Sequence, residues 1–179
     1  MRISYVVDRI DDNVIQFACE VIENNVGAVQ SGILIMHPSA VHLSRSFPEA
    51  VFEPLNLREK EWIFCPVNDS MPLRGGGTHW ALLVISKKFE RSFFLDSLTP
   101  TNFNVRRQTS TSLEAASQNN SSDCGVYTIL YTAVICQFIL RDDFTWIDSG
   151  LTSQSIDNMA RNAREFIHTQ LNCYFANRN

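Results

Sequence analysis

Hydrophobic and polar positions near the start of the chain follow a helical period. Val14, Phe17 and the apolar residues after them recur at three- and four-residue spacing, which places them on one face of a helix. Asp11 or Asp12 can accept hydrogen bonds from the first free N–H groups of that helix. The pattern therefore predicts a helix that ends near Gly27.

The next part of the chain is predicted to contain strands and loops. Residues 33–36 and 61–67 form short apolar runs, which are typical of buried strands. Pro38, Pro48 and Pro54 lie between the two runs. Because proline lacks the N–H group that a helix interior needs, we expect no helix there.

Further along, apolar segments predict more strands and a central helix. Residues 78–86 and 92–96 indicate two strands joined by a short turn, and 111–117 indicates a weaker third. The run at 125–140 is apolar on nearly every side, so we expect a buried helix there. A last helix, capped by Thr152 or Ser153, is predicted to carry on one face Ile156, Met159, Ala160, Ala163, Phe166, Ile167 and Leu171.

Composition limits the classes of protein to consider. A chain of 179 residues that is 45% hydrophobic and 19% charged can bury one core, which predicts a single domain over 1–179. A net charge of −4 argues against nucleic-acid binding. A membrane-spanning helix needs about 20 apolar residues, and no apolar run approaches that length. Asp8 interrupts the chain before a signal peptide could develop. We therefore expect a cytoplasmic and/or nuclear protein, and a monomer because no heptad pattern is present.

The cysteines indicate a nucleophile rather than a structural framework. Five cysteines without a C-x-x-C pair predict neither a disulfide network nor a zinc ribbon, so we expect reduced thiols. Cys124 differs from the others because the polar residues QNNSSD precede it and a predicted helix follows. A helix N-terminus lowers the pKa of a thiol, although a lone cysteine is more often a packing residue. The cysteines assigned to packing are Cys19, Cys65, Cys136 and Cys173.

An imidazole and a carboxylate that could assist this thiol lie at the ends of two predicted strands. His79 begins one strand after a glycine loop, and Asp96 ends the next. A carboxylate behind an imidazole holds the ring in one tautomer and stabilises its charged form. Gln118 could add an amide N–H to the backbone N–H of Cys124 to bind an oxyanion. The other histidines, expected to be surface or capping residues, are His37, His42 and His168.

The order of these residues resembles the ubiquitin-like-specific cysteine protease family, which includes the SUMO (sentrin-specific) proteases. The shared pattern is His79-Trp80, then Asp96, then Gln118 to Gly125. Four flanking stretches fit the family and are most similar to its deneddylase branch: FEPLNL at 52–57, IFCPVND at 63–69, GGGTHWALLV at 75–84 and SFFLDS at 92–97.

The resemblance implies an α+β, papain-like fold in which a central helix bearing Cys124 packs on a mixed sheet bearing His79 and Asp96. It implies a thiol protease that hydrolyses peptide or isopeptide bonds after the C-terminal Gly-Gly of a ubiquitin-like modifier, with no metal or cofactor. Cys124 would attack the glycine carbonyl, His79 would transfer the proton and Asp96 would orient the ring. Gln118 would bind the oxyanion. The neddylation modifier is the favoured partner, and SUMO is the second choice.

Four further residues match family positions near the substrate. Trp80 corresponds to a tryptophan that helps form a narrow channel, which admits glycine because glycine has no Cβ. Asn68 and Asp69 match positions near the cleft. Asp12 ends the segment at 9–12, RIDD, where the family has Trp-Leu-Asn-Asp and the tryptophan closes the channel.

Two differences from the family bear on substrate binding. Arg9 replaces the aromatic lid residue and the segment before it is short, so we expect weaker affinity for the modifier. The connection between Asp96 and Cys124 shows no helical period where relatives have a helix, and its shortening could loosen the catalytic geometry. The alternatives that remain open are a SUMO-specific protease, a relative that binds a modifier without cleaving it, and an acyltransferase with a coenzyme A donor.

Overall fold

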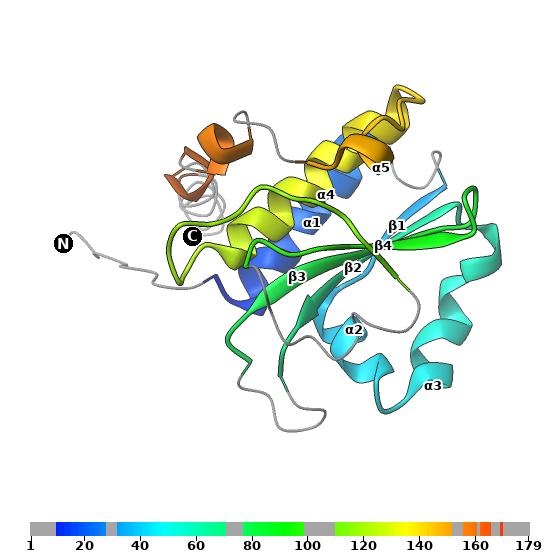
Figure 1. The fold of residues 1–179 in the computed structure, drawn as a ribbon. Coiled ribbons are helices and arrows are strands. Elements are labelled where there is room, and N and C mark those ends of the chain that lie inside the picture. The colour runs from blue at the N-terminus through cyan, green and yellow to red at the C-terminus, as the bar shows by residue number, and fades with distance from the viewer. Residues whose placement is uncertain are drawn as a thin grey trace.

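The computed structural model describes residues 10–27, 32–70, 77–98, 110–151, 156–160 and 162–165, together with residue 169. In this part of the chain a mixed sheet lies between helices on its two faces (Figure 1). This arrangement confirms the predicted α+β fold. The elements in chain order are α1 (Asp12–Val26), β1 (Ile33–Ile35), α2 (Pro38–Ser44), α3 (Pro48–Phe52), η1 (Glu53–Leu55), η2 (Leu57–Glu59), β2 (Trp62–Asn68), β3 (Trp80–Ser86), β4 (Arg91–Leu95), β5 (Thr111–Ser112), α4 (Cys124–Leu140) and α5 (Trp146–Ser149).

The pairing of the strands decides which residues meet at the ends of the sheet. Five strands lie in the order β1-β2-β3-β4-β5, with β2, β3 and β4 antiparallel and the edge strands β1 and β5 parallel to their neighbours. β3 and β4 form a hairpin in which Leu82 lies opposite Leu95. The start of β3 therefore lies beside the end of β4, so the flanking residues His79 and Asp96 share one end of the sheet.

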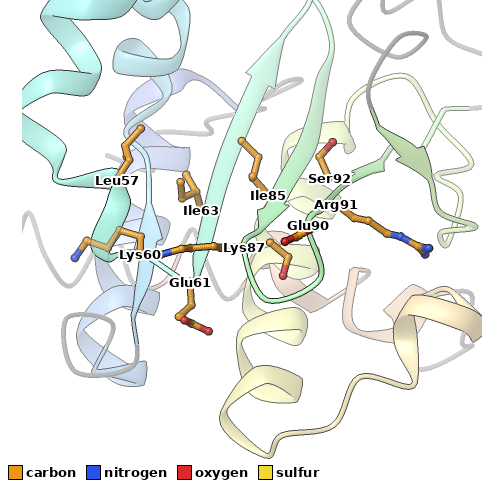
Figure 2. Close-up of a pocket in the computed structure, with 10 residues that line it drawn as sticks. Leu57, Lys60, Glu61, Ile63, Ile85, Lys87, Glu90, Arg91 and Ser92 are labelled. Atoms are coloured by element: carbon orange, nitrogen blue, oxygen red, sulfur yellow. The ribbon is translucent and has the colours of Figure 1, made fainter.

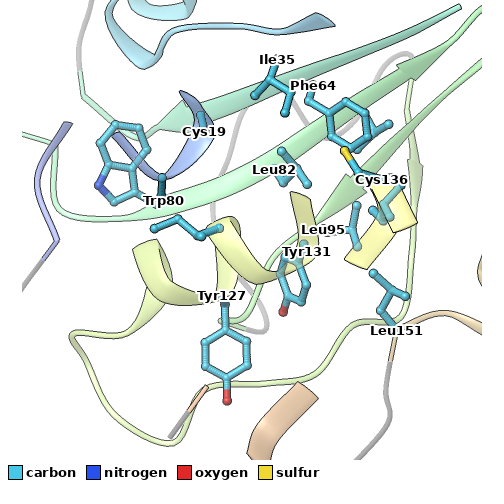
Figure 3. Packing of buried hydrophobic residues seen from close by; sticks show 14 of the residues in the cluster. Cys19, Ile35, Phe64, Trp80, Leu82, Leu95, Tyr127, Tyr131, Cys136 and Leu151 are labelled. Carbon is cyan, nitrogen blue, oxygen red and sulfur yellow. The ribbon is translucent and has the colours of Figure 1, made fainter. Parts of the chain in front are cut away.

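The two faces of the sheet bury separate hydrophobic cores. Leu82 and Val84 of β3 join the core formed with α1 and α4, whereas Ala81 and Leu83 join the core formed with α2 and α3. This division follows from the two-residue period of side chains along a strand. Figure 3 shows Leu82 directed toward the helix that carries Tyr131.

The helix α4 is apolar on nearly every side, as predicted, and begins at Cys124, one residue earlier than expected. Gly125 allows a close approach at its start, because a Cβ there would lie 2.9 Å from the Cβ of Ile10. Tyr131 is fully buried, and its hydroxyl donates to the carbonyl of Ala116. The helix therefore contacts Ile10, which precedes α1, and also Ala116, in the segment that leads to Cys124.

The prediction of no helix between 33–36 and 61–67 is wrong. Pro38 and Pro48 are the first residues of α2 and α3. Proline is well suited to that position because the N–H groups of the first turn have no partner within the helix. Pro54 lies in the short 3₁₀ helix η1. These helices cover the sheet face opposite α4.

The remaining predictions are confirmed in part. The weak strand at 111–117 is limited to β5, and Ala115 forms an isolated bridge with Leu151. Residues 156–160 and 162–165 are helical, as predicted. No helix in the described ranges is long and apolar enough to cross a membrane. Parts of these predictions lie outside the described residues: Thr152, Ser153, Phe166, Ile167, Leu171, and 99–109 in the connection between Asp96 and Cys124.

Candidate active site

His79 and Asp96 meet at the shared end of β3 and β4. His79 Nε2 lies 2.7 Å from Asp96 Oδ1, and the exposed fractions of the two side chains are 8% and 6%. Asp96 Oδ1 also accepts the backbone N–H of Leu98 at 2.9 Å. The carboxylate is therefore fixed from two directions, in surroundings that exclude most of the solvent.

Asp69 holds the backbone of His79 in place. Its Oδ1 accepts the N–H groups of Thr78 at 2.5 Å and of His79 at 2.9 Å, and its Oδ2 accepts the Thr78 hydroxyl at 3.1 Å. Burial would raise the pKa of Asp69, but these hydrogen bonds lower it below its usual value. The carboxylate thus supports His79, and its contact with a substrate stays a prediction.

Cys124 lies at the start of α4 and is 2% exposed. The thiol and the His79 ring interact closely enough to shift each other's pKa. Because Nε2 of that ring is engaged by Asp96, Nδ1 is the nitrogen that remains for the thiol. The backbone N–H groups of Trp80 and Gly125 also act on the sulfur and favour its charged form. The structure therefore brings together the cysteine, histidine and aspartate that the sequence singled out.

The electrostatics of this group favour an ion pair. Burial would raise the pKa of Cys124, yet hydrogen bonds to the His79 ring and to two backbone N–H groups, with the charge of His79, lower it below its usual value. Burial would lower the pKa of His79, but hydrogen bonds to Asp96 and Cys124 and their negative charges raise it to about 9. Both shifts favour the thiolate and imidazolium over the neutral pair, and the thiolate is the form in which a cysteine is nucleophilic.

The other described cysteines have the opposite character. Burial is the main cause that raises the pKa of Cys19, Cys65 and Cys136 to about 12. All three are buried and free of disulfide bonds. They remain neutral thiols, as expected of packing residues, while Cys173 lies outside the described residues.

Gln118 lies on the segment that leads to Cys124, and its amide is fixed at both ends. Its Oε1 accepts the Ser97 hydroxyl at 2.6 Å, and its Nε2 donates to the carbonyl of Asn120 at 2.6 Å. Because a carbonyl only accepts, the contact with Asn120 defines which end of the amide is the donor. The NH₂ group carries a second N–H, so an oriented donor is present. Its action on an oxyanion stays a prediction.

The residues expected near a substrate differ in their burial and in their hydrogen bonds. Trp80 pairs with Asn68 across β2 and β3, is 6% exposed, and lies in the core beside α4 (Figure 3). Asn68 accepts the N–H of Ser70 through its side chain at 2.9 Å and the Arg45 guanidinium through its carbonyl at 2.5 Å. Asp12 is exposed in the first turn of α1. Contacts of these side chains with a modifier stay predictions.

Three supporting residues were not predicted from the sequence. Ser97 and Asn120 bind the two ends of the Gln118 amide. Arg164 pairs with Asp123, directly before the cysteine. Ser97 and Asn120 lie inside stretches that resemble the family, SFFLDS and QNNSSDCG, so the pattern could have indicated them. Arg164 is 41 residues from its partner, and such a contact leaves no local pattern.

A separate pocket lies at the other end of the sheet. It has a volume of about 430 Å³ and is lined by the end of β3 and the start of β4, including Ile85 and Arg91 (Figure 2). His79 precedes β3 and Asp96 follows β4, so the length of the strands separates the pocket from the candidate active site. Among the described residues, no group of His, Cys, Asp and Glu side chains is arranged to hold a metal ion.

Curated relatives of the chain are proteases. Sentrin-specific protease 8 of Homo sapiens is 30% identical over 163 residues, which cover 74% of this chain and 73% of the human protein. A probable sentrin-specific protease 8 of Dictyostelium discoideum is 27% identical, covering 75% of this chain and 68% of its own. NEDD8-specific protease 1 of Arabidopsis thaliana is 30% identical, covering 55% of this chain and 47% of its own. No protein-family model matches the chain.

Solved structures agree with the observed fold. The chain superposes on the Xanthomonas campestris effector protein XopD bound to ubiquitin with a TM-score of 0.68 at 13% identity, covering 86% of this chain and 90% of the effector. A second match is the SUMO protease Ulp1, in a structure whose catalytic cysteine is oxidised to a sulfenic acid. The TM-score is 0.63 at 16% identity, and the match covers 91% of this chain and 78% of Ulp1. The fold is therefore that of the Ulp1 and XopD proteases.

Cys124 is expected to react with iodoacetamide at a pH where ordinary thiols are inert. In the unaltered chain the rate should reach half its maximum below about pH 8.5, the usual pKa of a free cysteine. His79→Ala removes a hydrogen bond and a charge but leaves the burial, so the midpoint should rise to about 8.5 or above. Mass spectrometry of the Cys124 peptide after timed alkylation measures this, with Cys19 and Cys136, whose pKa is raised to about 12, as internal thiols that stay unmodified. An unchanged midpoint in His79→Ala would contradict the contact described above.

Proposed function

The chain belongs to the sentrin-specific protease family, and on that premise we propose that it is a cysteine protease that hydrolyses the bond after the C-terminal Gly-Gly of a ubiquitin-like modifier. The observation that carries the proposal is the arrangement of Cys124 at a helix start against a His79 ring that Asp96 holds at 2.7 Å. Such a group supplies a thiolate, a proton donor and an orienting carboxylate in one place.

The geometry suggests a two-step reaction. The thiolate of Cys124 attacks the carbonyl carbon of the terminal glycine, and the resulting oxyanion is stabilised by the backbone N–H of Cys124 and the Gln118 amide. His79 gives its proton to the leaving amine, which departs as the thioester forms. His79 then takes a proton from water, whose oxygen attacks the thioester carbonyl. The bond from that carbon to sulfur breaks, which releases the modifier as a carboxylic acid and restores the Cys124 thiolate beside the protonated ring. Asp96 keeps the ring oriented through both steps.

The preferred modifier is NEDD8. The Arabidopsis thaliana relative is named a NEDD8-specific protease, and the flanking stretches of this chain are most similar to the deneddylase branch. SUMO is the second candidate because the structural neighbour Ulp1 is a SUMO protease. The resemblance to the family implies a narrow passage beside Trp80, which would accept a Gly-Gly tail because glycine has no Cβ.

Two other functions have weaker support. A relative that binds a modifier without cleaving it is favoured by the replacement of the lid tryptophan by Arg9. The buried contacts of His79 with Asp96 and Cys124 argue for retained chemistry instead. An acyltransferase would use the same thiol but requires a coenzyme A donor.

Electrophilic probes test the proposed function directly. We expect a C-terminally reactive NEDD8 probe to label the chain faster than SUMO or ubiquitin probes, with all labelling lost in Cys124→Ala. Gel shift and mass spectrometry locate the adduct. Labelling by the SUMO probe alone would replace NEDD8 by SUMO as substrate. Binding without labelling would identify a non-cleaving relative, and self-acylation by an acyl-coenzyme A would identify an acyltransferase.

Gln118→Ala is expected to lower kcat about 100-fold with little change in KM, as for loss of one oxyanion donor. Asn119→Ala is the matched control, because Asn119 is adjacent in sequence and exposed. Turnover of a fluorogenic modifier substrate measures both constants. An unchanged kcat in Gln118→Ala would remove Gln118 from the mechanism.

A further inference from the structure

Asp123 precedes the nucleophile at the position that caps α4, but its carboxylate does not cap the helix. An aspartate there ordinarily accepts an N–H group of the first helical turn. Asp123 makes no such bond. Its Oδ2 accepts the Asn120 side chain at 2.7 Å, and its Oδ1 accepts Arg164 Nε at 2.9 Å and a second N–H of the same guanidinium.

Arg164 comes from a distant part of the chain and binds the two residues that precede Cys124, Ser122 and Asp123. It lies within the helical residues 162–165. Besides binding Asp123, it donates to the carbonyl of Ser122 at 3.1 Å. The side chains of Arg164 and Asp123 are 33% and 19% exposed, so the pair is shielded only in part. The Arg164 guanidinium therefore restrains the loop at Ser122 and Asp123 and pairs with the negative charge next to Cys124.

Because the Asp123 carboxylate does not bind the first turn of α4, the N–H groups of that turn remain available to the Cys124 sulfur. The N–H of Gly125, in the first turn of α4, is one of the groups that lower the pKa of Cys124. A carboxylate turned toward the first turn would compete for such N–H groups and would add a negative charge beside the thiolate. Asn120 contributes to the same orientation because it binds the other oxygen of Asp123.

We infer that Arg164 is a positioning residue for the nucleophile: it holds the Asp123 carboxylate away from the start of α4, so that this end of the helix stabilises the Cys124 thiolate. The inference rests on the proposed role of Cys124 as the attacking group. Charged groups at this end of the molecule come from several elements: His79 before β3 with Asp69 bound to its backbone, Asp96 after β4, Asp11 and Asp12 at the start of α1, Asp157 and Arg164 in the C-terminal helical residues, and Asp123 itself.

The sign of the effect follows from these charges. Without Arg164, the carboxylate of Asp123 lacks its guanidinium partner next to the thiolate, and negative charge disfavours a second negative charge. The pH midpoint of Cys124 alkylation should therefore rise when Arg164 loses its charge. Because the pair is partly exposed, the rise should shrink at high salt.

The test compares iodoacetamide alkylation of Cys124 between pH 5 and 10 in four variants, each checked for folding by circular dichroism. Arg164→Gln keeps length and N–H donors but removes the charge, and should raise the midpoint by about 0.5 to 1 pH unit. Arg164→Lys should keep most of the unaltered behaviour. Arg164→Gln combined with Asp123→Asn should restore the midpoint, since neither charge is then present. Arg141→Ala, at the far end of α4, is the matched control and should shift nothing.

Two outcomes would overturn the inference. One is an unchanged midpoint in Arg164→Gln at low salt. The other is an equal rise with and without Asp123→Asn, which would indicate general loosening of the loop rather than a charge effect. The readout needs no modifier, so it is independent of the probe experiment. If no probe labels the chain but the alkylation midpoints shift as expected, the proposed function is rejected and the role of Arg164 is retained.

Discussion

The hydrogen bond between His79 Nε2 and Asp96 Oδ1, 2.7 Å long and nearly closed to solvent, is the contact on which the rest of the site depends. It is made possible by the register of the hairpin, because pairing of Leu82 with Leu95 brings the start of β3 to the end of β4. The bond determines which ring nitrogen faces Cys124 and keeps the imidazole charged. A shift of one residue in this register would separate the carboxylate from the ring and would turn the side chains of the shifted strand to the opposite face of the sheet.

The helix α4 supplies the second half of the arrangement. Its first residue is Cys124, and its buried hydroxyls bind the segment that carries Gln118: Tyr131 donates to Ala116 and Tyr127 to Ser117. The amide of Gln118 is in turn held by Ser97, next to Asp96. Each part of the candidate active site is therefore positioned relative to the others by the sheet end and one helix, and Arg164 adds a restraint from a remote segment.

Local sequence patterns predicted the parts of the site but not all the contacts that hold them. Strand ends indicated His79 and Asp96, and a polar stretch before an apolar helix indicated Cys124, because these positions follow from short-range periodicity. The helices that begin at Pro38 and Pro48 were missed because the sequence does not show whether a proline stands in a first turn or an interior. The support of His79 by Asp69 depends on how β2 and β3 pair, which is long-range information.

The charge of His79 can be measured without any substrate, because Asp96 and Cys124 raise the pKa of its ring in the folded protein. An NMR titration of a histidine-labelled sample follows the ring of His79 directly, with Asp96→Asn for comparison. We expect a pKa of about 9 for His79 and a clearly lower value in Asp96→Asn. A ring that titrates near about 6.5, as a free histidine does, and that is unaffected by Asp96→Asn would contradict this expectation.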